Sequence, residues 1–291
     1  MSKLPTLTEL HKQALSEHWA VPHFNFSSLA QLNGILDGLK ESKSPAALGT
    51  SEGERKFIGA KQALYLVRSF REEEDIPVYI NADHHKTPES ALEAFDAGYE
   101  SIHADFSKES YEDNIAGVQK VVEKVKKNRP DVEVEGELGY FVTESSKIYK
   151  EAVEIPEDSY TKAEQAVDFV EKTGIDRFAP VIGNLHGIAA NKPVIRFDLV
   201  EKLRQALPNI TFVLHGGSGI VEEDMKKLVS MGFNNIHVST ELRIAYTEAL
   251  RQELAEKPEE VAPYHYLDQA RKAVAEVVKE KVKIFGSVGR V

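Results

Sequence analysis

Three histidines stand in segments suited to binding a catalytic metal. His84, His186 and His215 lie in the runs NADHH, GNLHG and LHGGSG, each of which closes or follows a short β-rich run. Any one of them alone is more simply explained as a capping or core histidine. Three imidazoles at corresponding positions of separate strands, however, can bind one divalent metal and leave a position open for substrate. The chain has no cysteine, so a metal must be held by His, Asp and Glu.

Acidic residues accompany these histidines. Asp83 directly precedes His84, so with His84 turned toward a metal, Asp83 is placed to act as a base beside a substrate. Asp105 ends another β-rich run, and Glu135 and Glu137 alternate in VEGELG, which puts both on one face of a strand. These carboxylates are candidates for metal binding or acid–base chemistry.

The elements that must position these residues alternate along the whole chain. The predicted strands cover 20–26, 46–51, 77–83, 101–106, 132–138, 177–183, 211–215 and 235–240. The predicted helices cover 28–42, 55–71, 88–97, 111–128, 162–173, 198–206 and 222–230, followed by 241–255 and a further helix past Pro263. The longest irregular piece, 139–160, follows the fifth strand and is long enough to be functional or mobile.

Eight β-then-α units favour a parallel sheet, because parallel strands need crossover helices between them. Polar residues gather at the carboxyl ends of at least six predicted strands. A closed barrel brings those ends to one mouth, whereas a doubly wound open sheet, the alternative topology, would scatter them along an edge. We therefore predict an α/β protein, a (β/α)₈ TIM barrel with parallel strands and an extra C-terminal helix, as one domain over residues 1–291.

The barrel prediction sharpens the interpretation of the acids. An acidic side chain inside a barrel is costly unless it is paired or metal-bound. Arg177 is the only basic residue in the predicted strands, and it opens its strand at the end opposite the mouth. We therefore favour a metal or catalytic role for Asp105, Glu135 and Glu137 over a structural ion pair.

A glycine-rich turn, GGSG at 216–219, follows the seventh predicted strand, and Ser239 and Thr240 close the eighth. Loops at these two places frequently bind phosphate in such barrels through exposed amides and hydroxyls. The turn is a weak signal alone and a stronger one at this location.

Bulk properties exclude several classes of function. The formal net charge of −11 argues against a nucleic-acid partner, although it does not exclude a small anionic substrate. No run of about 18 apolar residues suggests a membrane span or membrane partner. We expect a soluble cytoplasmic protein.

At these residues the chain resembles the class II fructose-bisphosphate and tagatose-bisphosphate aldolases, and the likeness covers nearly its whole length. The LHGGSG and ELG runs are specific together, and further similar segments are GTSEG at 49–53, YEDNI at 111–115, TGID at 173–176 and FGS at 285–287. The resemblance implies reversible aldol cleavage of a ketose 1,6-bisphosphate, with fructose 1,6-bisphosphate as the leading candidate. The products would be dihydroxyacetone phosphate and an aldehyde such as glyceraldehyde 3-phosphate.

The resemblance also implies roles for individual residues. His84, His186 and His215 would hold one Zn²⁺ per chain, Asp83 would exchange the proton of the C4 hydroxyl, and a second divalent or monovalent cation would be possible. Asp105 and Glu137 would line the metal's alternative position or its surroundings. Substrate or its phosphate would contact Asn25, Ser51, Gly187, Gly216, Gly217, Ser218, His237, Ser239 and Thr240. A homodimer or homotetramer would be expected.

This chain departs from the family pattern around the substrate. It has Asn81 and Ala82 where the family has His-Leu, and His237 where the family has Asn. The family's lysine and tyrosine after the second metal histidine are absent. The family's Gly-Gly pair and acid after the ELG run are replaced by YFVTESS, in which Glu144 is the candidate for the mobile acid. The metal ligands are retained.

Two observations separate the remaining interpretations. Aldol chemistry without a metal needs a Schiff-base lysine inside the barrel, and no predicted strand contains a lysine. A metal-dependent barrel hydrolase commonly has His-x-His on the first strand, but the second histidine position here is Asn25. A homologue that has lost catalysis remains an alternative, although it would be expected to lack a metal ligand or Asp83.

Overall fold

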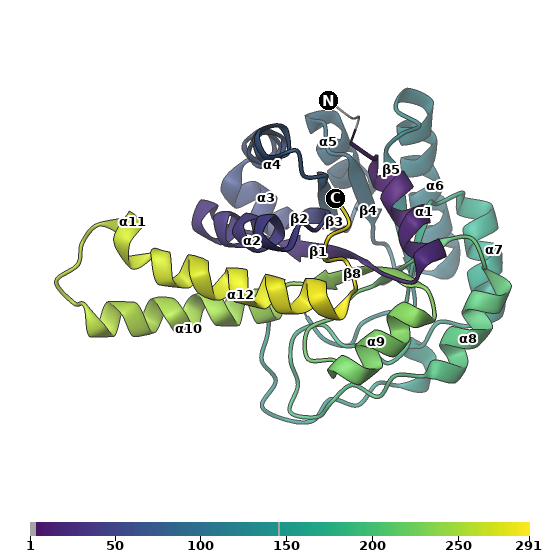
Figure 1. The fold of residues 1–291 in the computed structure, drawn as a ribbon. Coiled ribbons are helices and arrows are strands. Elements are labelled where there is room, and N and C mark those ends of the chain that lie inside the picture. The colour runs from purple at the N-terminus through teal and green to yellow at the C-terminus, as the bar shows by residue number, and fades with distance from the viewer. Residues whose placement is uncertain (1–3, 145) are drawn as a thin grey trace.

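Eight parallel strands, within the residues 4–144 and 146–291 that the computed structural model describes, close into a barrel (Figure 1). Neighbours in sequence are neighbours in the sheet, and β1 closes the ring by pairing with both β2 and β8. The strands are β1 (Val21–Asn25), β2 (Ala46–Ser51), β3 (Val78–His85), β4 (Ser101–Ala104), β5 (Glu133–Leu138), β6 (Arg177–Pro180), β7 (Thr211–Leu214) and β8 (Phe233–Val238). The predicted barrel is confirmed, with most strand bounds within three residues of the prediction.

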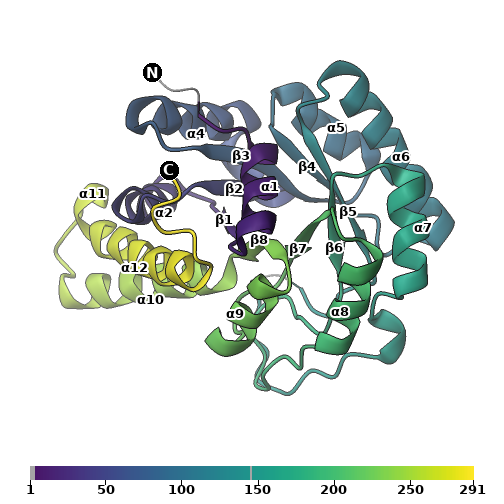
Figure 2. The ribbon, with the colours of Figure 1, turned by 45° about the vertical axis from the view of Figure 1, so that its right-hand side comes forward.

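Helices surround the barrel on its outer face (Figure 2). They are α1 (Leu7–Glu17), α2 (Leu29–Ser42), α3 (Glu52–Ile58), α4 (Ala60–Glu74), α5 (Pro88–Ala97), α6 (Tyr111–Asn128), α7 (Ala163–Thr173), α8 (Phe197–Ala206), α9 (Glu222–Ser230), α10 (Thr240–Glu256), α11 (Pro263–Tyr266) and α12 (Asp268–Ile284), with a short 3₁₀ turn η1 (Glu157–Ser159). No helix of the described chain is both long and apolar enough to cross a membrane.

Two helical predictions need correction. The helix predicted over 55–71 is two helices, because Gly59 has a φ of +97° and breaks the chain between α3 and α4. Helix α1 was not predicted at all. Its start carries a capping box, in which Thr6 and Glu9 bond each other's backbone amides, and this S/T-x-x-E pattern was visible in the sequence.

Helix α1 lies across the end of the barrel opposite the mouth (Figure 2). Leu7, Leu10 and Ala14 on its apolar side pack with Trp19 and Val21 in a small buried cluster. His11 of the same helix reaches into the barrel, where its Nδ1 lies 2.9 Å from Glu133 Oε2. The base of the barrel is therefore closed by both apolar and polar contacts.

Strand alternation divides apolar from polar side chains. Phe24, Leu48 and Ile80 belong to the large apolar cluster formed with the surrounding helices. The alternate strand positions hold buried polar residues. These are His23, Asn81, Ser101, His103, Glu133, Glu135, Arg177, Asn235 and His237. Because successive strand side chains point to opposite faces, the polar set fills the barrel interior. The barrel core is a polar network that leads up to the mouth.

The C-terminal helices form an arm that projects beyond the barrel (Figures 1 and 2). Helix α12 packs closely on α2 through Gly34 and Gly38. A Cβ at Gly34 would lie 2.4 Å from the Arg271 backbone oxygen and 2.9 Å from Val274 Cβ. Close backbone approach, for which glycine is required, thus fixes the arm on the barrel.

The substitution Gly34→Ala tests this packing against Gly53→Ala, whose added Cβ would meet nothing within 4 Å. We expect Gly34→Ala to lower the free energy of unfolding by about 1–3 kcal/mol, since a backbone oxygen must move. Gly53→Ala should be neutral or stabilising by up to ~1 kcal/mol, as helix propensity predicts. Denaturant unfolding measures both, and equal changes in the two variants would contradict the packing argument.

Candidate metal and substrate site

Two adjoining pockets open where the strands end. The larger, of about 290 Å³, is lined by residues that follow β2 to β5, and the smaller, of about 30 Å³, by residues that follow β6 to β8. Both are lined by Asn25, Asp83, His84 and His186. Every residue predicted to belong to the site lines one of the two pockets except Gly217 and the strand-five acid Glu135.

The three predicted metal ligands gather at the boundary between the pockets. The ring centroid of His84 lies 4.4 Å from that of His215 and 4.9 Å from that of His186, and the last two are 5.9 Å apart. His215 is buried, and the other two are partly exposed toward the pockets. The three imidazoles come from three different strand ends, as predicted.

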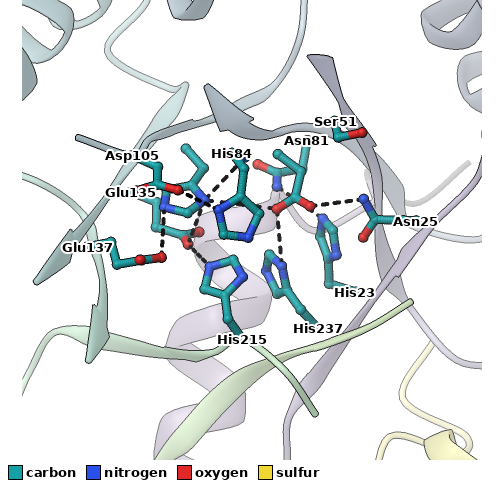
Figure 3. A network of polar contacts seen from close by, with 12 residues as sticks. His23, Asn25, Ser51, Asn81, His84, Asp105, Glu135, Glu137, His215 and His237 are labelled. Atoms are coloured by element: carbon teal, nitrogen blue, oxygen red, sulfur yellow. Dashed lines mark hydrogen bonds and ion pairs between the residues drawn. The ribbon is translucent and has the colours of Figure 1, made fainter. Parts of the chain in front are cut away.

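His84 is held by a carboxylate. Its Nδ1 donates to Asp105 Oδ2 at 2.7 Å, which leaves Nε2 as the nitrogen with a free lone pair (Figure 3). Burial alone would lower the pKa of His84, but the charge of Asp83 and the bond to Asp105 outweigh it and raise the pKa to about 9. The surroundings of His84 therefore favour positive charge, which a cation bound at Nε2 would supply in place of the ring proton.

His215 is held in the same way by a different carboxylate. Its Nε2 lies 2.6 Å from Glu135 Oε1, which leaves Nδ1 as the free nitrogen (Figure 3). Burial and the charge of His84 lower the pKa of His215 to about 4, so its ring is neutral, as a metal ligand must be.

The structural ion pairs that the sequence disfavoured are present for two of the barrel acids. Arg177 Nη2 lies 3.1 Å from Glu135 Oε2 although Arg177 begins at the far end of β6, because its side chain spans the interior. Asp105 forms an ion pair with Lys86, which lies just past the predicted third strand. Ser107 Oγ also donates to Asp105 Oδ1 at 2.7 Å.

His186 is positioned by two loops. Its ring stacks on Phe141 with centroids 4.0 Å apart, and its backbone amide donates to Thr143 Oγ1 at 2.9 Å. Gly187 has a φ of +77°, and a Cβ there would lie 2.4 Å from the Lys147 backbone oxygen. In the described chain, some groups of His, Asp and Glu have their possible ligand atoms within 4.8 Å of one another. These groups include His84 and His215 but not His186.

Asp83 is clamped between side chains from two other strands. Its Oδ2 accepts from Asn25 Nδ2 at 2.9 Å, and its Oδ1 lies 3.3 Å from His237 Nδ1. The His237 ring stacks on His23 with centroids 3.5 Å apart. Burial would raise the pKa of Asp83, but the charge of His84 and contacts with neighbouring imidazoles hold the pKa well below its usual range. Asp83 is therefore an ionised carboxylate.

Glu137 and Glu135 share the interior face of β5, as their alternation predicted. Glu137 Oε1 lies 2.9 Å from Ser107 Oγ, and its Oε2 lies 3.6 Å from His103 Nε2. Burial and the neighbouring charge of Asp105 raise the pKa of Glu137 to about 7. A cation placed nearby would relieve this repulsion.

The predicted phosphate contacts line the smaller pocket around the start of α10. Gly187, Gly216, Ser218, Ser239 and Thr240 all line it. Ser239 precedes α10 without capping the helix through its side chain, and Ser218 Oγ instead accepts from the Glu241 amide at 3.3 Å. Gly217 instead donates its amide to the His237 backbone oxygen at 3.0 Å, which supports the turn from behind.

Ser51 and Glu144 lie on the larger pocket. Ser51 caps α3 in a capping box with Glu54. Glu144 is exposed, its Oε2 lies 2.5 Å from Lys147 Nζ, and this contact lowers the pKa of the carboxyl.

Sequence reasoning missed several residues that the fold brings to the site. Lys86 and Arg243 line the larger pocket, and Arg243 pairs with Glu54. His103 lies among the buried carboxylates of β5. Its position two residues before Asp105 was a usable signal, since period two puts both on one face.

The chain matches known proteins over nearly its whole length. Residues 5–290 match the family model described as fructose-bisphosphate aldolase class-II. A Bacillus subtilis (strain 168) protein named "Probable fructose-bisphosphate aldolase" is 36% identical over 287 residues, which are 98% of each chain. The fructose-bisphosphate aldolase of Geobacillus stearothermophilus is 34% identical over 99% of this chain and 98% of its own. The chain belongs to the class II fructose-bisphosphate aldolase family.

A solved structure agrees with this assignment. The crystal structure of the YdjI aldolase from Escherichia coli K12 superposes with a TM-score of 0.83 at 30% identity and covers 99% of both chains. The protein is thus a class II ketose-bisphosphate aldolase, a lyase of a metal-dependent family. Its site fits that requirement, because carboxylates leave a free imidazole nitrogen on both His84 and His215.

Removal of single ligands of the predicted aldolase site should separate metal binding from other roles. Wild type should bind about one divalent metal per chain, as an open catalytic site does. His84→Ala and His215→Ala should each abolish tight binding of Zn²⁺, because a three-ligand site loses one donor. Ser51→Ala, which leaves the cluster intact, is the control. Metal analysis after dialysis measures this, and full Zn²⁺ retention by either histidine variant would remove that residue from the ligand set.

Proposed function

We propose that this aldolase uses Zn²⁺ to cleave a ketose 1,6-bisphosphate reversibly, with fructose 1,6-bisphosphate as the leading substrate. One observation carries the proposal. Asp83, an ionised carboxylate fixed by Asn25, lies beside His84 at the boundary between the two pockets. The base thus lies beside His84 and next to the smaller pocket, which Ser218, Ser239 and Thr240 line, and this arrangement supports the proposal.

In the proposed complex, His84, His186 and His215 hold the metal. Bound Zn²⁺ would act as a Lewis acid on the ketose carbonyl and stabilise the negative charge released when the C3–C4 bond breaks. The free nitrogens of His84 and His215 support these two assignments. His186 is placed less tightly, and its approach would follow movement of the loop that carries Phe141.

The phosphate of the dihydroxyacetone phosphate half would bind in the smaller pocket. The backbone turns at Gly187 and Gly216 would supply amides there, and Ser218, Ser239 and Thr240 would supply hydroxyls. With its phosphate held there, the substrate would extend into the larger pocket, so the C4 hydroxyl would pass Asp83.

Asp83 would take the proton of the C4 hydroxyl as the C3–C4 bond opens, and would return it in the synthetic direction. The bond to Asn25 and the contact with His237 keep the carboxylate from rotating away. In this assignment His237 supports the base in addition to any contact with substrate.

The proposal is tested by assaying a panel of ketose mono- and bisphosphates with Zn²⁺ present. We expect cleavage of a ketose 1,6-bisphosphate that is abolished by a chelator and restored by Zn²⁺. Full activity in a metal-free preparation, with borohydride and substrate trapping a lysine adduct, would contradict it.

Asp83→Ala should keep its metal and fold but lower kcat by roughly 10²–10⁴, the usual contribution of a positioned acid–base group. Asp83→Asn is the matched variant that keeps shape without basicity, and it should be equally slow. Stopped-flow assay of cleavage alongside metal analysis measures both effects. Near-wild-type turnover in either variant would show that another group accepts the proton.

We also propose that Glu144 delivers the proton to C3 of the dihydroxyacetone phosphate half. It lies on the loop after β5, lines the larger pocket, and is exposed and paired with Lys147, so it would have to turn inward. Phe141, Thr143 and Glu144 share that pocket lining, which supports a loop that closes over substrate.

Glu144→Gln should slow exchange of the C3 proton of dihydroxyacetone phosphate with solvent deuterium, while leaving its binding nearly intact. The carboxyl would be exchanging that proton, whereas the phosphate contacts lie in the smaller pocket. Lys147→Met is the control, since it removes the ion-pair partner but not the acid. NMR measures the exchange, and an unchanged rate in Glu144→Gln would leave the proton donor elsewhere.

A further inference from the structure

A buried histidine outside the predicted ligand set, His103, lies against two of the predicted metal ligands. The ring centroid of His103 is 4.6 Å from that of His84 and 4.7 Å from that of His215. It is therefore closer to both than His186 is, and His103 is fully buried. Its place in the cluster makes it either another ligand or a support for the ligands.

Hydrogen bonding decides between these two roles. The backbone amide of His84 donates to His103 Nδ1 at 3.3 Å, so this nitrogen acts as an acceptor. A neutral ring then carries its proton on Nε2, which lies 3.6 Å from Glu137 Oε2. Glu135 Oε1 is an acceptor 3.5 Å from Nδ1, and it already accepts from His215. A ring in this tautomer has no lone pair left for a metal.

His84 needs such a support because its backbone is unusual. Its φ is +51°, in the left-handed region that residues other than glycine rarely adopt. The pairing of β3 with β4 shifts register between Ala82 and His85, so the ladder does not hold the intervening residues regularly. The bond from the His84 amide to His103 replaces a ladder bond at this point, and the Asp105 bond fixes the ring.

We propose that His103 is a positioning residue, which holds the backbone of His84 in its left-handed conformation and thereby aims His84 at the metal. The inference rests on the metal centre of the proposed function. His103 makes no contact with substrate in this role, and it acts through His84 and through the face it packs against His215.

The test compares His103→Leu with His103→Asn, whose side chains have nearly the same shape. Asparagine keeps an acceptor, Oδ1, close to the place of Nδ1, whereas leucine has none. We expect His103→Leu to weaken Zn²⁺ affinity by roughly 10–100-fold, as loss of a ligand's supporting partner does, and His103→Asn to recover most of that loss. Competition with a chromophoric chelator measures the affinity.

A second measurement reports ligand geometry directly. Co²⁺ substituted for Zn²⁺ should give an altered visible absorption spectrum in His103→Leu and a spectrum close to wild type in His103→Asn. The control is His11→Leu, which removes a buried histidine at the opposite end of the barrel and should leave both the affinity and the spectrum unchanged. If His103→Leu does not fold, His103→Phe, which fills the ring volume without an acceptor, takes its place.

The outcomes are distinct. Wild-type affinity and spectrum in His103→Leu would overturn the inference, and so would equal losses in the leucine and asparagine variants, which would indicate packing alone. Failure of the wild-type protein to bind any divalent metal would instead overturn the proposed metal centre, and this inference with it. If Zn²⁺ binding requires His84 but is unchanged in His103→Leu, the proposed metal centre is supported and the role of His103 is overturned.

Discussion

Charged side chains inside the barrel must be neutralised by partners, because burial without pairing is costly. Arg177 is the centre of this pairing. It is fully buried, lies 3.1 Å from Glu135, and donates to Asn235 Oδ1 at 3.0 Å and Asn81 Oδ1 at 3.1 Å. The polar layer above it depends on this cation, since Arg177 is the partner of Glu135 Oε2 while His215 is the partner of Oε1.

The ion pair between Arg177 and Glu135 affects which nitrogen of the His215 imidazole is free. Because Arg177 Nη2 lies against Glu135 Oε2 at 3.1 Å, the other oxygen, Oε1, remains to accept from His215 Nε2 and leave Nδ1 free. Asp105 does the same for His84. Carboxylates behind metal-binding histidines fix both tautomer and ring direction, so the site is organised before a metal arrives. The buried carboxylates of the interior therefore orient the imidazoles at the mouth.

The part of the site around His186 is carried by two loops that contact each other. The loop after β5 bonds the turn after β6 through the Lys147 and Ile188 backbones, and Thr143 holds the His186 amide. The predicted metal ligand His186 and the proposed proton donor Glu144 thus lie on contacting segments. Movement of one loop would displace the other. Closure of the loop after β5 over a substrate would therefore change the position of His186. The departures from the family pattern at His237 and in this loop lie among residues that line the two pockets.

The sequence alone predicted the barrel, because period-two strands and amphipathic helices are local patterns. It also predicted that His84, His186 and His215 lie near Asp83, because the strand ends of a barrel share one mouth. It also placed Glu135 and Glu137 on one face. Only the tertiary structure decided which partner each acid takes. Arg177 bonds Asn81 from 96 residues away, and His103 bonds the His84 amide across a register shift. Such contacts depend on side-chain reach and backbone irregularity in three dimensions, and no local periodicity encodes them.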